Sequence, residues 1–395
     1  MADVLRILTL NSIAPVGLKR LPAERYSVGT NVQSPDAILV RSQDMHAMDI
    51  AQSVKAIGRA GAGTNNIPVA AMNQRGVPVF NAPGANANAV KELVLAGMLL
   101  AARNLVPAIR FVDALSGTSE EINTAVEEGK KHFSGVELPH HVLGIIGLGR
   151  IGSLVADAAI KLGMNVQGYD PEITVDAAWS LPSQVKKAHS IEEVMRNSEF
   201  VTLHVPLVDE TRNLIDAKRI GLMKHGAVLL NFSRDGIVDN DAVVQALDAK
   251  RLKAYVCDFP SATFHGHPGV VALPHLGAST REAEDNSAVM VVEQLRDYLE
   301  NGNVRNAVNF PDVTMVRESP YRLGIANANV PNMVGQISTA VAQAGLNIHN
   351  MLNKSKRDMA YTLVDVDSPV PSKVIDRIAA IGGVLAVRYL PAEAP

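Results

Sequence analysis

The sequence predicts an α/β protein built on parallel sheets, with a ferredoxin-like module near its C-terminal end. Three observations support this prediction. Residues 142–152 form an apolar strand pattern that ends in Gly-x-Gly-x-x-Gly and passes into a helical pattern. Strand, loop and helix patterns alternate before and after this stretch, as they do in parallel sheets. Beyond Pro311 the order changes to βαββαβ over residues 319–390.

The glycine-rich stretch has the residues that a dinucleotide site needs. Gly147 permits a tight turn, Gly149 lets the backbone approach a pyrophosphate, and Gly152 lets the helix pack on the strand. The helix N-terminus offers unpaired N–H groups and a partial positive charge to the phosphates. A second strand pattern, residues 165–169, ends at Asp170, whose carboxylate can accept hydrogen bonds from the adenosine ribose and would repel a 2′-phosphate. The sequence therefore predicts NAD rather than NADP as the cofactor.

Composition limits the class of protein. The 395 residues are enough for two or three domains, and 47% of them are hydrophobic. A formal charge of −3 gives no basic excess, so we expect no nucleic-acid partner. No run of 18 apolar residues is present, so we expect no membrane partner. The single cysteine, Cys257, excludes an internal disulfide framework and a multi-cysteine metal site, and no metal is expected. Without a recognisable signal peptide, the expected location is the cytoplasm.

The remaining patterns order the elements around this site. Strands are expected at residues 4–10, 37–40, 54–58, 77–80, 200–205, 227–231, 254–258 and 270–273. Helices are expected at residues 87–114, with an interruption at Pro107, and at residues 153–162, 241–249 and 279–300. The loops at residues 59–66 and 81–86 follow apolar runs. We therefore expect both loops at the carboxyl ends of strands, where ligands bind in parallel sheets.

Two residues suit the chemistry of a nicotinamide enzyme. Arg234 follows the strand pattern at 227–231, and its guanidinium can hold a substrate carboxylate through two parallel hydrogen bonds. His275 follows the strand pattern at 270–273, and an unperturbed histidine changes charge near neutral pH. The sequence therefore predicts Arg234 as the substrate anchor and His275 as the proton donor or acceptor.

Several motifs in one order resemble the D-2-hydroxyacid dehydrogenase family over nearly the whole chain. They are Gly147-x-Gly149-x-x-Gly152, Asp170, His204-Val-Pro-Leu207, Asn231-x-x-Arg234 and Pro274-His275-Leu-Gly-Ala-Ser-Thr280. The loops Arg59-Ala-Gly-x-Gly-x-Asn65 and Asn81-x-Pro-Gly84 are similar to the branch of this family that acts on 3-phosphoglycerate, and the C-terminal module resembles an ACT domain. The resemblance implies two Rossmann-like domains, the first split by insertion of the second.

The resemblance also implies boundaries and roles. A substrate-binding domain would comprise residues 1–88 and 281–310, a NAD-binding domain residues 89–280, and an ACT-like regulatory domain residues 319–395. Contacts with NAD would come from Gly147, Gly149, Arg150, Ile151, Gly152, Asp170, Pro206, Phe232, Ser233, Arg234, Asp258, His275, Gly277 and Ala278. Substrate would be held by Arg41, Arg59, Ala62, Gly63, Asn81 and Lys131, with Arg59 the first choice for a phosphate in the first domain. Asn329 and Asn347 would contact an amino-acid effector.

The implied activity is NAD-dependent oxidation of 3-phosphoglycerate to 3-phosphohydroxypyruvate, the first step of serine biosynthesis, by a homodimer or homotetramer. Two other hypotheses stay open. One is a different D-2-hydroxyacid dehydrogenase. The other is a NAD-sensing binding protein with weakened catalysis, which only the absence of one family residue supports.

That residue is a catalytic glutamate beside the histidine, and Ala262 or Thr263 stands at its position here. We expect an active enzyme whose keto-acid reduction loses rate at a lower pH than usual, unless Glu282 or Glu284 replaces the carboxylate. Two further departures concern ligand binding. Lys130-Lys131-His132 stands where an arginine is expected. Asn327 and Asn332 replace a histidine and a glycine of serine-binding ACT domains, so serine inhibition should be weak or absent.

Overall fold

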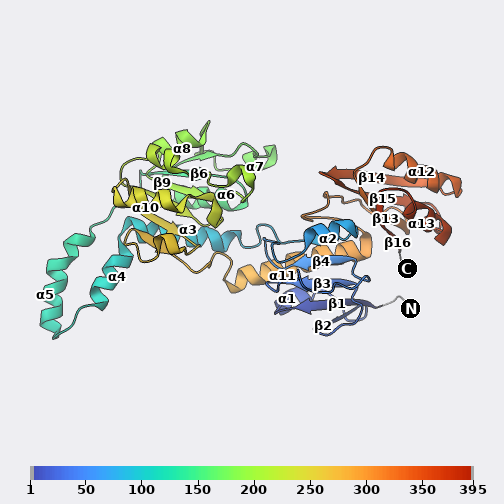
Figure 1. Ribbon diagram of the computed structural model, residues 1–395, viewed down its shortest axis with the longest axis horizontal. Coiled ribbons are helices and arrows are strands. Elements are labelled where there is room, and N and C mark those ends of the chain that lie inside the picture. The colour runs from blue at the N-terminus through green and yellow to red at the C-terminus, as the bar shows by residue number, and fades with distance from the viewer. Residues whose placement is uncertain (1–3, 393–395) are drawn as a thin grey trace. The chain divides into compact units, whose positions relative to one another are not determined.

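A computed structural model describes residues 4–392 and divides the chain into two compact units (Figure 1). The first unit combines the chain up to Asn86 with the chain from Arg281 onward, and the second unit is Ala87–Thr280. The chain therefore leaves the first unit once and returns to it once. The predicted insertion of one Rossmann-like domain into another is confirmed.

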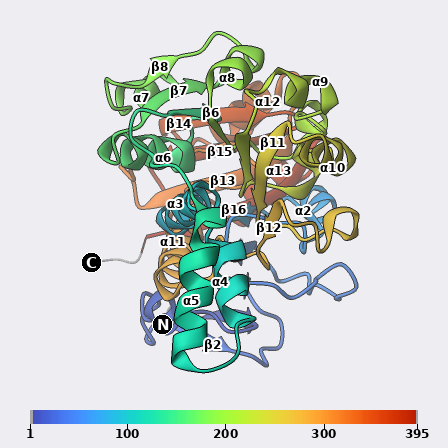
Figure 2. The ribbon, with the colours of Figure 1, turned by 90° about the vertical axis from the view of Figure 1, so that its left-hand side faces the viewer.

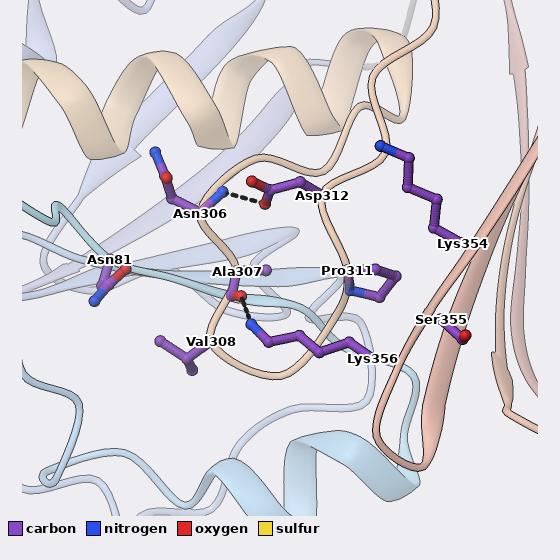
Figure 3. Close-up of a pocket in the computed structure, with 9 residues that line it drawn as sticks. All are labelled: Asn81, Asn306, Ala307, Val308, Pro311, Asp312, Lys354, Ser355 and Lys356. Atoms are coloured by element: carbon purple, nitrogen blue, oxygen red, sulfur yellow. Dashed lines mark hydrogen bonds between the residues drawn. The ribbon is translucent and has the colours of Figure 1, made fainter. Parts of the chain in front are cut away.

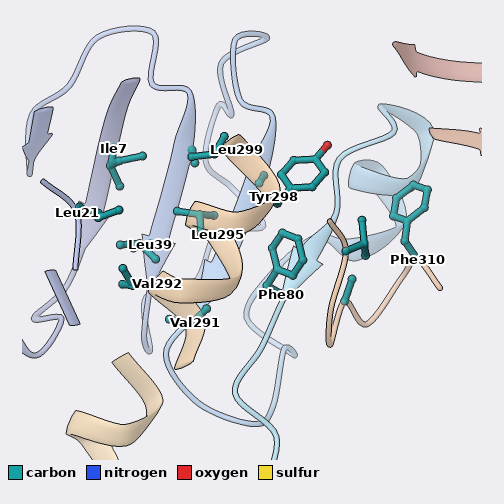
Figure 4. Close-up of a cluster of buried hydrophobic side chains, with 14 of the residues drawn as sticks. Ile7, Leu21, Leu39, Phe80, Val291, Val292, Leu295, Tyr298, Leu299 and Phe310 are labelled. Carbon is teal, nitrogen blue, oxygen red and sulfur yellow. The ribbon is translucent and has the colours of Figure 1, made fainter. Parts of the chain in front are cut away.

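The first unit contains a five-stranded parallel sheet in the order β2-β1-β3-β4-β5. Its strands are β1 (Leu5–Leu10), β2 (Tyr26–Gly29), β3 (Ala37–Val40), β4 (Ala56–Arg59) and β5 (Val79–Phe80), and its helices are α1 (Pro15–Leu18), α2 (Val69–Gln74) and α11 (Arg281–Asn301). In Figure 4, Val291, Val292 and Leu295 of α11 pack against the sheet side chains Ile7 and Leu39, and all five are fully buried. This long helix returns from the second unit and completes the core of the first.

The second unit contains a seven-stranded parallel sheet in the order β12-β11-β10-β9-β6-β7-β8. Its strands are β6 (Val142–Ile146), β7 (Asn165–Tyr169), β8 (Lys186–Lys187), β9 (Phe200–Leu203), β10 (Ala227–Asn231), β11 (Leu252–Cys257) and β12 (Val270–Ala272). The helices around it are α3 (Ala87–Ala102), α6 (Arg150–Lys161), α7 (Val175–Trp179), α8 (Ile191–Asn197), α9 (Ala217–Leu222) and α10 (Asn240–Asp248). Strand β6 pairs with β7 on one side and β9 on the other. The strand order therefore reverses at β6, which is where open α/β sheets bind ligands.

The helices α4 (Leu105–Asp113) and α5 (Ser119–Gly129) lie side by side as an arm of the second unit (Figures 1 and 2). The predicted interruption at Pro107 is wrong. The helix breaks at Asn104, whose backbone is left-handed with a φ of 51°, and Pro107 lies in the first turn of α4, where its missing N–H costs nothing. No pattern predicted α5, because its residues are polar. A capping box at its start stabilises it instead, with Thr118 and Glu121 each accepting the other's backbone N–H.

Within residues 4–392, no single helix is long and apolar enough to cross a bilayer. Helices α3 and α4 together would be long and apolar enough, but the chain bends by 67° at the break between them. The side chains of Val94 and Met98 on α3 are fully buried in the core of the second unit. Within the same described residues, His, Cys, Asp and Glu side chains form no group of three or more that could hold a metal ion.

The C-terminal module has the predicted βαββαβ order. It comprises β13 (Tyr321–Ala328), α12 (Met333–Gln343), β14 (Ile348–Lys356), β15 (Met359–Val366), α13 (Ser372–Ala379) and β16 (Val384–Pro391). The strands form an antiparallel sheet in the order β14-β15-β13-β16, the arrangement of a ferredoxin-like fold. Two helices cover one face of this sheet. Side chains of the other face, including Tyr361 and Leu363, belong to the same core cluster as Tyr298 and Phe310.

One fully buried ion pair lies inside this module, and its arginine also binds the preceding segment. The guanidinium of Arg322 on β13 binds the carboxylate of Asp365 on β15 through Nε at 2.6 Å and Nη2 at 2.8 Å. Its remaining N–H groups donate to the carbonyl oxygens of Asn301, Met315 and Val316 at 3.0–3.1 Å. All five donors of the guanidinium are therefore used, as a charge buried away from water requires.

Candidate active site

The glycine-rich turn after β6 has the geometry that its sequence predicts. Gly147 has a φ of 94°, and a Cβ there would lie 2.5 Å from the carbonyl oxygen of His204. A Cβ on Gly152 would lie 2.0 Å from the carbonyl oxygen of Gly147. Around Gly149, at the N-terminus of α6, nothing lies within 4 Å of a Cβ. The two outer glycines therefore close the turn, and the middle one leaves room for a pyrophosphate at the helix N-terminus.

Asp170 follows β7 and fixes the same turn. Its Oδ2 accepts a hydrogen bond from the backbone N–H of Leu148 at 2.8 Å, and its Oδ1 accepts one from Glu172 at 2.9 Å. Beside it is a cavity of about 460 Å³ with apolar walls that include Ile173 and Leu181. An apolar cavity next to a carboxylate suits an adenine ring and its ribose hydroxyls. The residues present therefore fit NAD.

Replacing Asp170 by alanine is expected to narrow the preference for NAD over NADP, mainly by weakening NAD. The variant loses the acceptor for the ribose and the hydrogen bonds that hold the turn. A charge-assisted hydrogen bond contributes about 1.5–3 kcal/mol, so kcat/KM with NAD should fall roughly ten-fold or more. Steady-state kinetics with both cofactors measure this ratio. Glu172→Ala, which removes an exposed neighbouring carboxylate, is the matched control. Equal turnover with NAD and NADP in the unmutated protein would refute the prediction.

The turn after β10 presents Arg234. Fully buried Asn231 holds this turn from inside, because its Oδ1 accepts from the N–H of Ser233 at 3.1 Å and its Nδ2 donates to the carbonyl of Arg234 at 2.8 Å. The Arg234 side chain is exposed and donates to the carbonyl of Ser233 at 2.6 Å. In the described part of the second unit it forms no ion pair, so its guanidinium is available to a carboxylate. Asn231 is a positioning residue whose role the sequence did not predict.

The loop after β12 presents His275. This residue has a left-handed backbone with a φ of 58°, and its ring packs edge-on against Phe259 with centroids 5.1 Å apart. Buried Asp258, at the end of β11, accepts hydrogen bonds from the backbone N–H groups of Leu276 and Gly277, both at 2.7 Å. Both oxygens of this carboxylate therefore hold the loop that carries the histidine. The predicted contact of Asp258 with NAD stays a prediction beside this positioning role.

No carboxylate stands in the place of the family's glutamate. Ala262 and Thr263 lie in a short 3₁₀ turn, η4 (Ala262–Phe264), where the N–H of Thr263 donates to the hydroxyl of Ser261 at 3.3 Å. Within the described part of the second unit, neither ring nitrogen of His275 has a hydrogen-bond partner. In the first unit, Glu284 binds Arg41 with a distance of 2.5 Å between Oε1 and Nη2. Replacement of the missing carboxylate by Glu282 or Glu284 stays a prediction.

In the first unit, the predicted substrate loops follow the neighbouring strands β3, β4 and β5, as expected. Side-chain hydrogen bonds connect them. Arg59 Nε donates to the carbonyl of Arg41 at 3.0 Å, and Asn66 donates to the carbonyl of Gln43 at 2.8 Å. The side-chain amide of Asn81 donates to the carbonyl of Ala62. The Arg59 guanidinium lies over Gly61, where a Cβ would be 2.2 Å from Nη1, and Gly63 lies in the same loop. The loops thus form one connected surface at the carboxyl edge of the sheet.

The positions of two predicted site residues, Lys131 and Phe232, limit how each could contact a ligand, and both contacts stay predictions. Lys131 is exposed in the 3₁₀ turn η1 (Lys130–Phe133) after α5, and it belongs to the second unit rather than to the first domain, because the chain does not return to the first unit before Arg281. Phe232 has a buried side chain that packs on α3, where a Cβ on Gly97 would lie 2.9 Å from its Cζ. Only the backbone of Phe232 is therefore available to a cofactor.

The other predicted cofactor residues lie in turns at the carboxyl ends of the strands or at the start of α6. Arg150, Pro206 and Ala278 are exposed, Ile151 and Ser233 are half-buried, and Gly277 is buried. The sequence noted His204 only as part of a motif. Its Nε2 lies 3.0 Å from the hydroxyl of Thr202, and burial lowers the pKa of its imidazole to about 3. His204 is therefore neutral at physiological pH, and its carbonyl oxygen packs against the glycine turn.

The predicted effector residues of the C-terminal module are both exposed. The Asn329 amide donates to the carbonyl of Arg357 at 3.0 Å, and the backbone N–H of Asn347 donates to Asp367 Oδ1 at 3.1 Å. Asn332, in place of the family's glycine, has a φ of 61°, a conformation that asparagine tolerates better than most residues. The side chain of Asn327, in place of the histidine, is buried. The turn therefore keeps its backbone shape without the histidine.

The parallel sheet, the glycine turn with Asp170, and the exposed Arg234 and His275 define a NAD-dependent dehydrogenase of 2-hydroxy acids. Residues 95–277 match the family model of the D-isomer specific 2-hydroxyacid dehydrogenase, NAD binding domain. A solved structure of cofactor (NAD+)-bound 3-phosphoglycerate dehydrogenase from Entamoeba histolytica has a TM-score of 0.61 and 26% identity, and covers 78% of this chain and 99% of that one.

Relatives at higher identity narrow the family. D-3-phosphoglycerate dehydrogenases of Escherichia coli K12 and Haemophilus influenzae Rd are 33% and 32% identical, and each match covers 87% of this chain and 83% of the relative. The enzyme of Methanocaldococcus jannaschii is 35% identical over 80% of this chain, which spans 59% of that relative's length. The chain belongs to the D-3-phosphoglycerate dehydrogenases of the D-2-hydroxyacid dehydrogenase family.

Proposed function

We propose that this protein oxidises 3-phosphoglycerate to 3-phosphohydroxypyruvate with NAD, the first step of serine biosynthesis. The observation that carries the proposal is the pair Arg234 and His275. Both side chains are exposed at the carboxyl edge of the NAD-binding sheet, and each loop is held by a buried polar residue. NAD supplies the acceptor for the hydride that leaves carbon 2.

Residues of this chain bind the substrate, transfer the proton and position the catalytic loop. The Arg234 fork binds the substrate carboxylate through two hydrogen bonds and so orients carbon 2. His275 in its neutral form takes the proton of the 2-hydroxyl group during oxidation and returns it during reduction. Asp258 holds the histidine loop through the backbone of Leu276 and Gly277. This division needs no further carboxylate beside the histidine.

We propose residues 1–88 and 281–310 as the substrate-binding domain, residues 89–280 as the NAD-binding domain, and residues 319–395 as the regulatory domain. The substrate phosphate is assigned first to Arg59. Arg41, which binds Glu284, is the second candidate. Ala62, Gly63 and Asn81 complete the proposed substrate loops.

Arg59→Ala is expected to raise the KM for 3-phosphoglycerate by roughly ten-fold or more, because a charge-assisted hydrogen bond to phosphate contributes about 1.5–3 kcal/mol. Its effect on unphosphorylated glycerate should be much smaller. Arg20→Ala, which removes an exposed arginine of the same unit, is the control. If Arg59 only braces its loop, both substrates will be affected equally. Equal activity of the unmutated enzyme on glycerate and 3-phosphoglycerate would overturn the substrate assignment.

The decisive test of the proposed function is NAD reduction followed by absorbance, with a panel of phosphorylated and unphosphorylated 2-hydroxy acids. The proposal requires 3-phosphoglycerate to have the highest kcat/KM. A higher value for an unphosphorylated acid indicates a different 2-hydroxyacid dehydrogenase. NAD binding without turnover of any acid indicates a binding protein.

We propose a homodimer formed through the arm. Leu105, Ile109 and Val112 lie at i, i+4 and i+7 on α4 and are 39%, 56% and 53% exposed, so they form an apolar stripe on one face. A second copy would cover this stripe. Ile109→Glu is expected to convert the dimer to a monomer in light-scattering measurements at micromolar concentration, whereas Ala114→Glu, off the stripe, should not. A monomeric unmutated protein would contradict this assignment.

Asn329 and Asn347 remain our proposed contacts for an amino-acid effector. Because the Asn329 amide already binds Arg357 and the family's histidine is absent, the response to serine is expected to be weak. We place the reaction in the cytoplasm, a reducing compartment in which the buried free thiol of Cys257 is stable.

A further inference from the structure

A cavity of about 550 Å³ lies within the first unit, between the β14–β15 hairpin and the segment at residues 304–313 (Figure 3). Lys354, Ser355 and Lys356 of the hairpin line one side. Asn306 and Asp312 of the segment line the other side, with Asn81 beside them. The cavity is separate from the predicted effector residues Asn329 and Asn347, neither of which lines it.

The charges around this cavity are not balanced by the protein. Among the described residues, the Lys354 ammonium has no hydrogen-bond or ion-pair partner. The Lys356 ammonium donates one hydrogen bond, to the carbonyl of Ala307 at 3.0 Å. An ammonium has three donors, so three remain on Lys354 and two on Lys356. Asp312 accepts from the backbone N–H of Asn306 at 2.8 Å and pairs with neither lysine within 4 Å. The lining therefore has one net positive charge.

We propose that this cavity binds a small dianion, a phosphorylated or dicarboxylic metabolite, through Lys354 and Lys356. The Lys354 and Lys356 ammonium groups point in different directions (Figure 3), so each can bind one of two separate negative charges, and each new contact is a charge-assisted hydrogen bond. Lys356 can bind the ligand without giving up its bond to Ala307. The volume is several times larger than a phosphate ion, since one water takes about 30 Å³, so a short carbon chain fits as well.

The cavity is connected to the proposed substrate loop by a short path. Ala307 pairs with Phe80 of β5 in an isolated bridge, and the backbone N–H of Asn81 donates to the carbonyl of Asn306 at 3.4 Å. The side chain of Asn81 then binds the carbonyl of Ala62 in the loop that carries Arg59. A ligand that draws Lys356 and the 304–313 segment together acts on the end of this path that lies at the cavity. Occupancy is therefore expected to change the KM for substrate, a coupling that rests on the proposed function.

Binding is tested by calorimetry on the full chain with inorganic phosphate and with malonate. An Arg59→Ala background removes the phosphate contact proposed for the substrate loop. Both probes are expected to bind at least ten-fold more tightly than acetate, which has one charge. Lys354→Gln should raise both dissociation constants about ten-fold, whereas Lys373→Gln, an exposed lysine on α13, should leave them unchanged. The tighter of the two probes identifies the ligand's anionic group as phosphate or carboxylate. An unchanged thermal midpoint of the variants shows that they remain folded.

Three results would overturn the site. The first is no binding of either probe at millimolar concentration, and the second is an unchanged dissociation constant in Lys354→Gln. The third is a rise in the dissociation constant in Lys373→Gln as large as that in Lys354→Gln. The coupling is tested separately. At constant ionic strength, saturating malonate should shift the KM for 3-phosphoglycerate at least three-fold in the Arg59-containing enzyme and not in its Lys354→Gln variant. An unchanged KM overturns the coupling. Calorimetric binding without any NAD reduction would refute the proposed function and leave the site standing.

Discussion

Replacing His275 by alanine is expected to lower kcat about 10²–10⁴-fold while NAD still binds, because a positioned general acid or base contributes a factor of that size. The ring packs edge-on against Phe259 and makes no hydrogen bond in the described part of its unit, so its loss should not unfold the loop. Asp258 still holds the backbone of Leu276 and Gly277 in the variant. Initial rates in both directions and fluorescence titration with NADH measure the two quantities.

The control is His265→Ala, which removes an exposed histidine of the same unit and should leave kcat unchanged. Arg234→Ala should lower kcat/KM as well, because the substrate carboxylate loses its partner. If His275→Ala and Arg234→Ala both keep near-normal activity, the dehydrogenase function itself is wrong. If His275→Ala abolishes NAD binding, the residue acts through its predicted contact with NAD, and its role in proton transfer loses its support.

The second large effect concerns stability. Arg322→Ala leaves the fully buried carboxylate of Asp365 without a partner, and breaking a buried ion pair in this way costs about 3–5 kcal/mol. The three carbonyl groups that accept from Arg322 lose their donor too. Unfolding in urea, followed by circular dichroism, should show the transition of the first unit at a lower midpoint.

A double variant separates the ion pair from simple packing. Replacing Arg322 by methionine and Asp365 by leucine removes both charges and should recover much of the lost free energy of unfolding. Arg317→Ala, which removes a neighbouring arginine that binds the carbonyl of Leu390, is a milder comparison. If Arg322→Ala lowers the free energy of unfolding by less than about 1 kcal/mol, the Arg322–Asp365 pair contributes no more than a surface ion pair, and the prediction is wrong.

The sequence predicted the elements that periodic patterns and turn glycines encode. The glycine turn, Asp170 and the βαββαβ order were found where expected, because each depends on local chemistry along a short stretch. It did not predict α5, which a polar capping box stabilises without buried residues. It also placed the helix break at Pro107 rather than Asn104, because a proline is tolerated in the first turn of a helix.

Contacts between segments that are far apart in the sequence could not be predicted from residue patterns. Arg41 binds Glu284 across 243 positions, so a residue proposed for phosphate is already paired. The motif around Asp258 predicts a contact with the cofactor, but it does not predict that both oxygens of this carboxylate hold a loop 18 and 19 residues away. Such hydrogen bonds depend on how the sheet brings strand ends together, which residue spacing alone does not determine.

The C-terminal module shares a buried core with the first sheet, and this limits which shortened forms of the chain can be stable. Tyr361 and Leu363 of the module lie in one buried cluster with Tyr298 of α11, and Arg388 stacks on the Tyr298 ring at 4.5 Å. A premature stop codon or a protease cut near residue 318 would expose this apolar surface to water. We expect the shortened chain to aggregate or be degraded rather than to work as an unregulated enzyme. Loss of the module in a lineage would therefore require new polar residues on α11 at the same time.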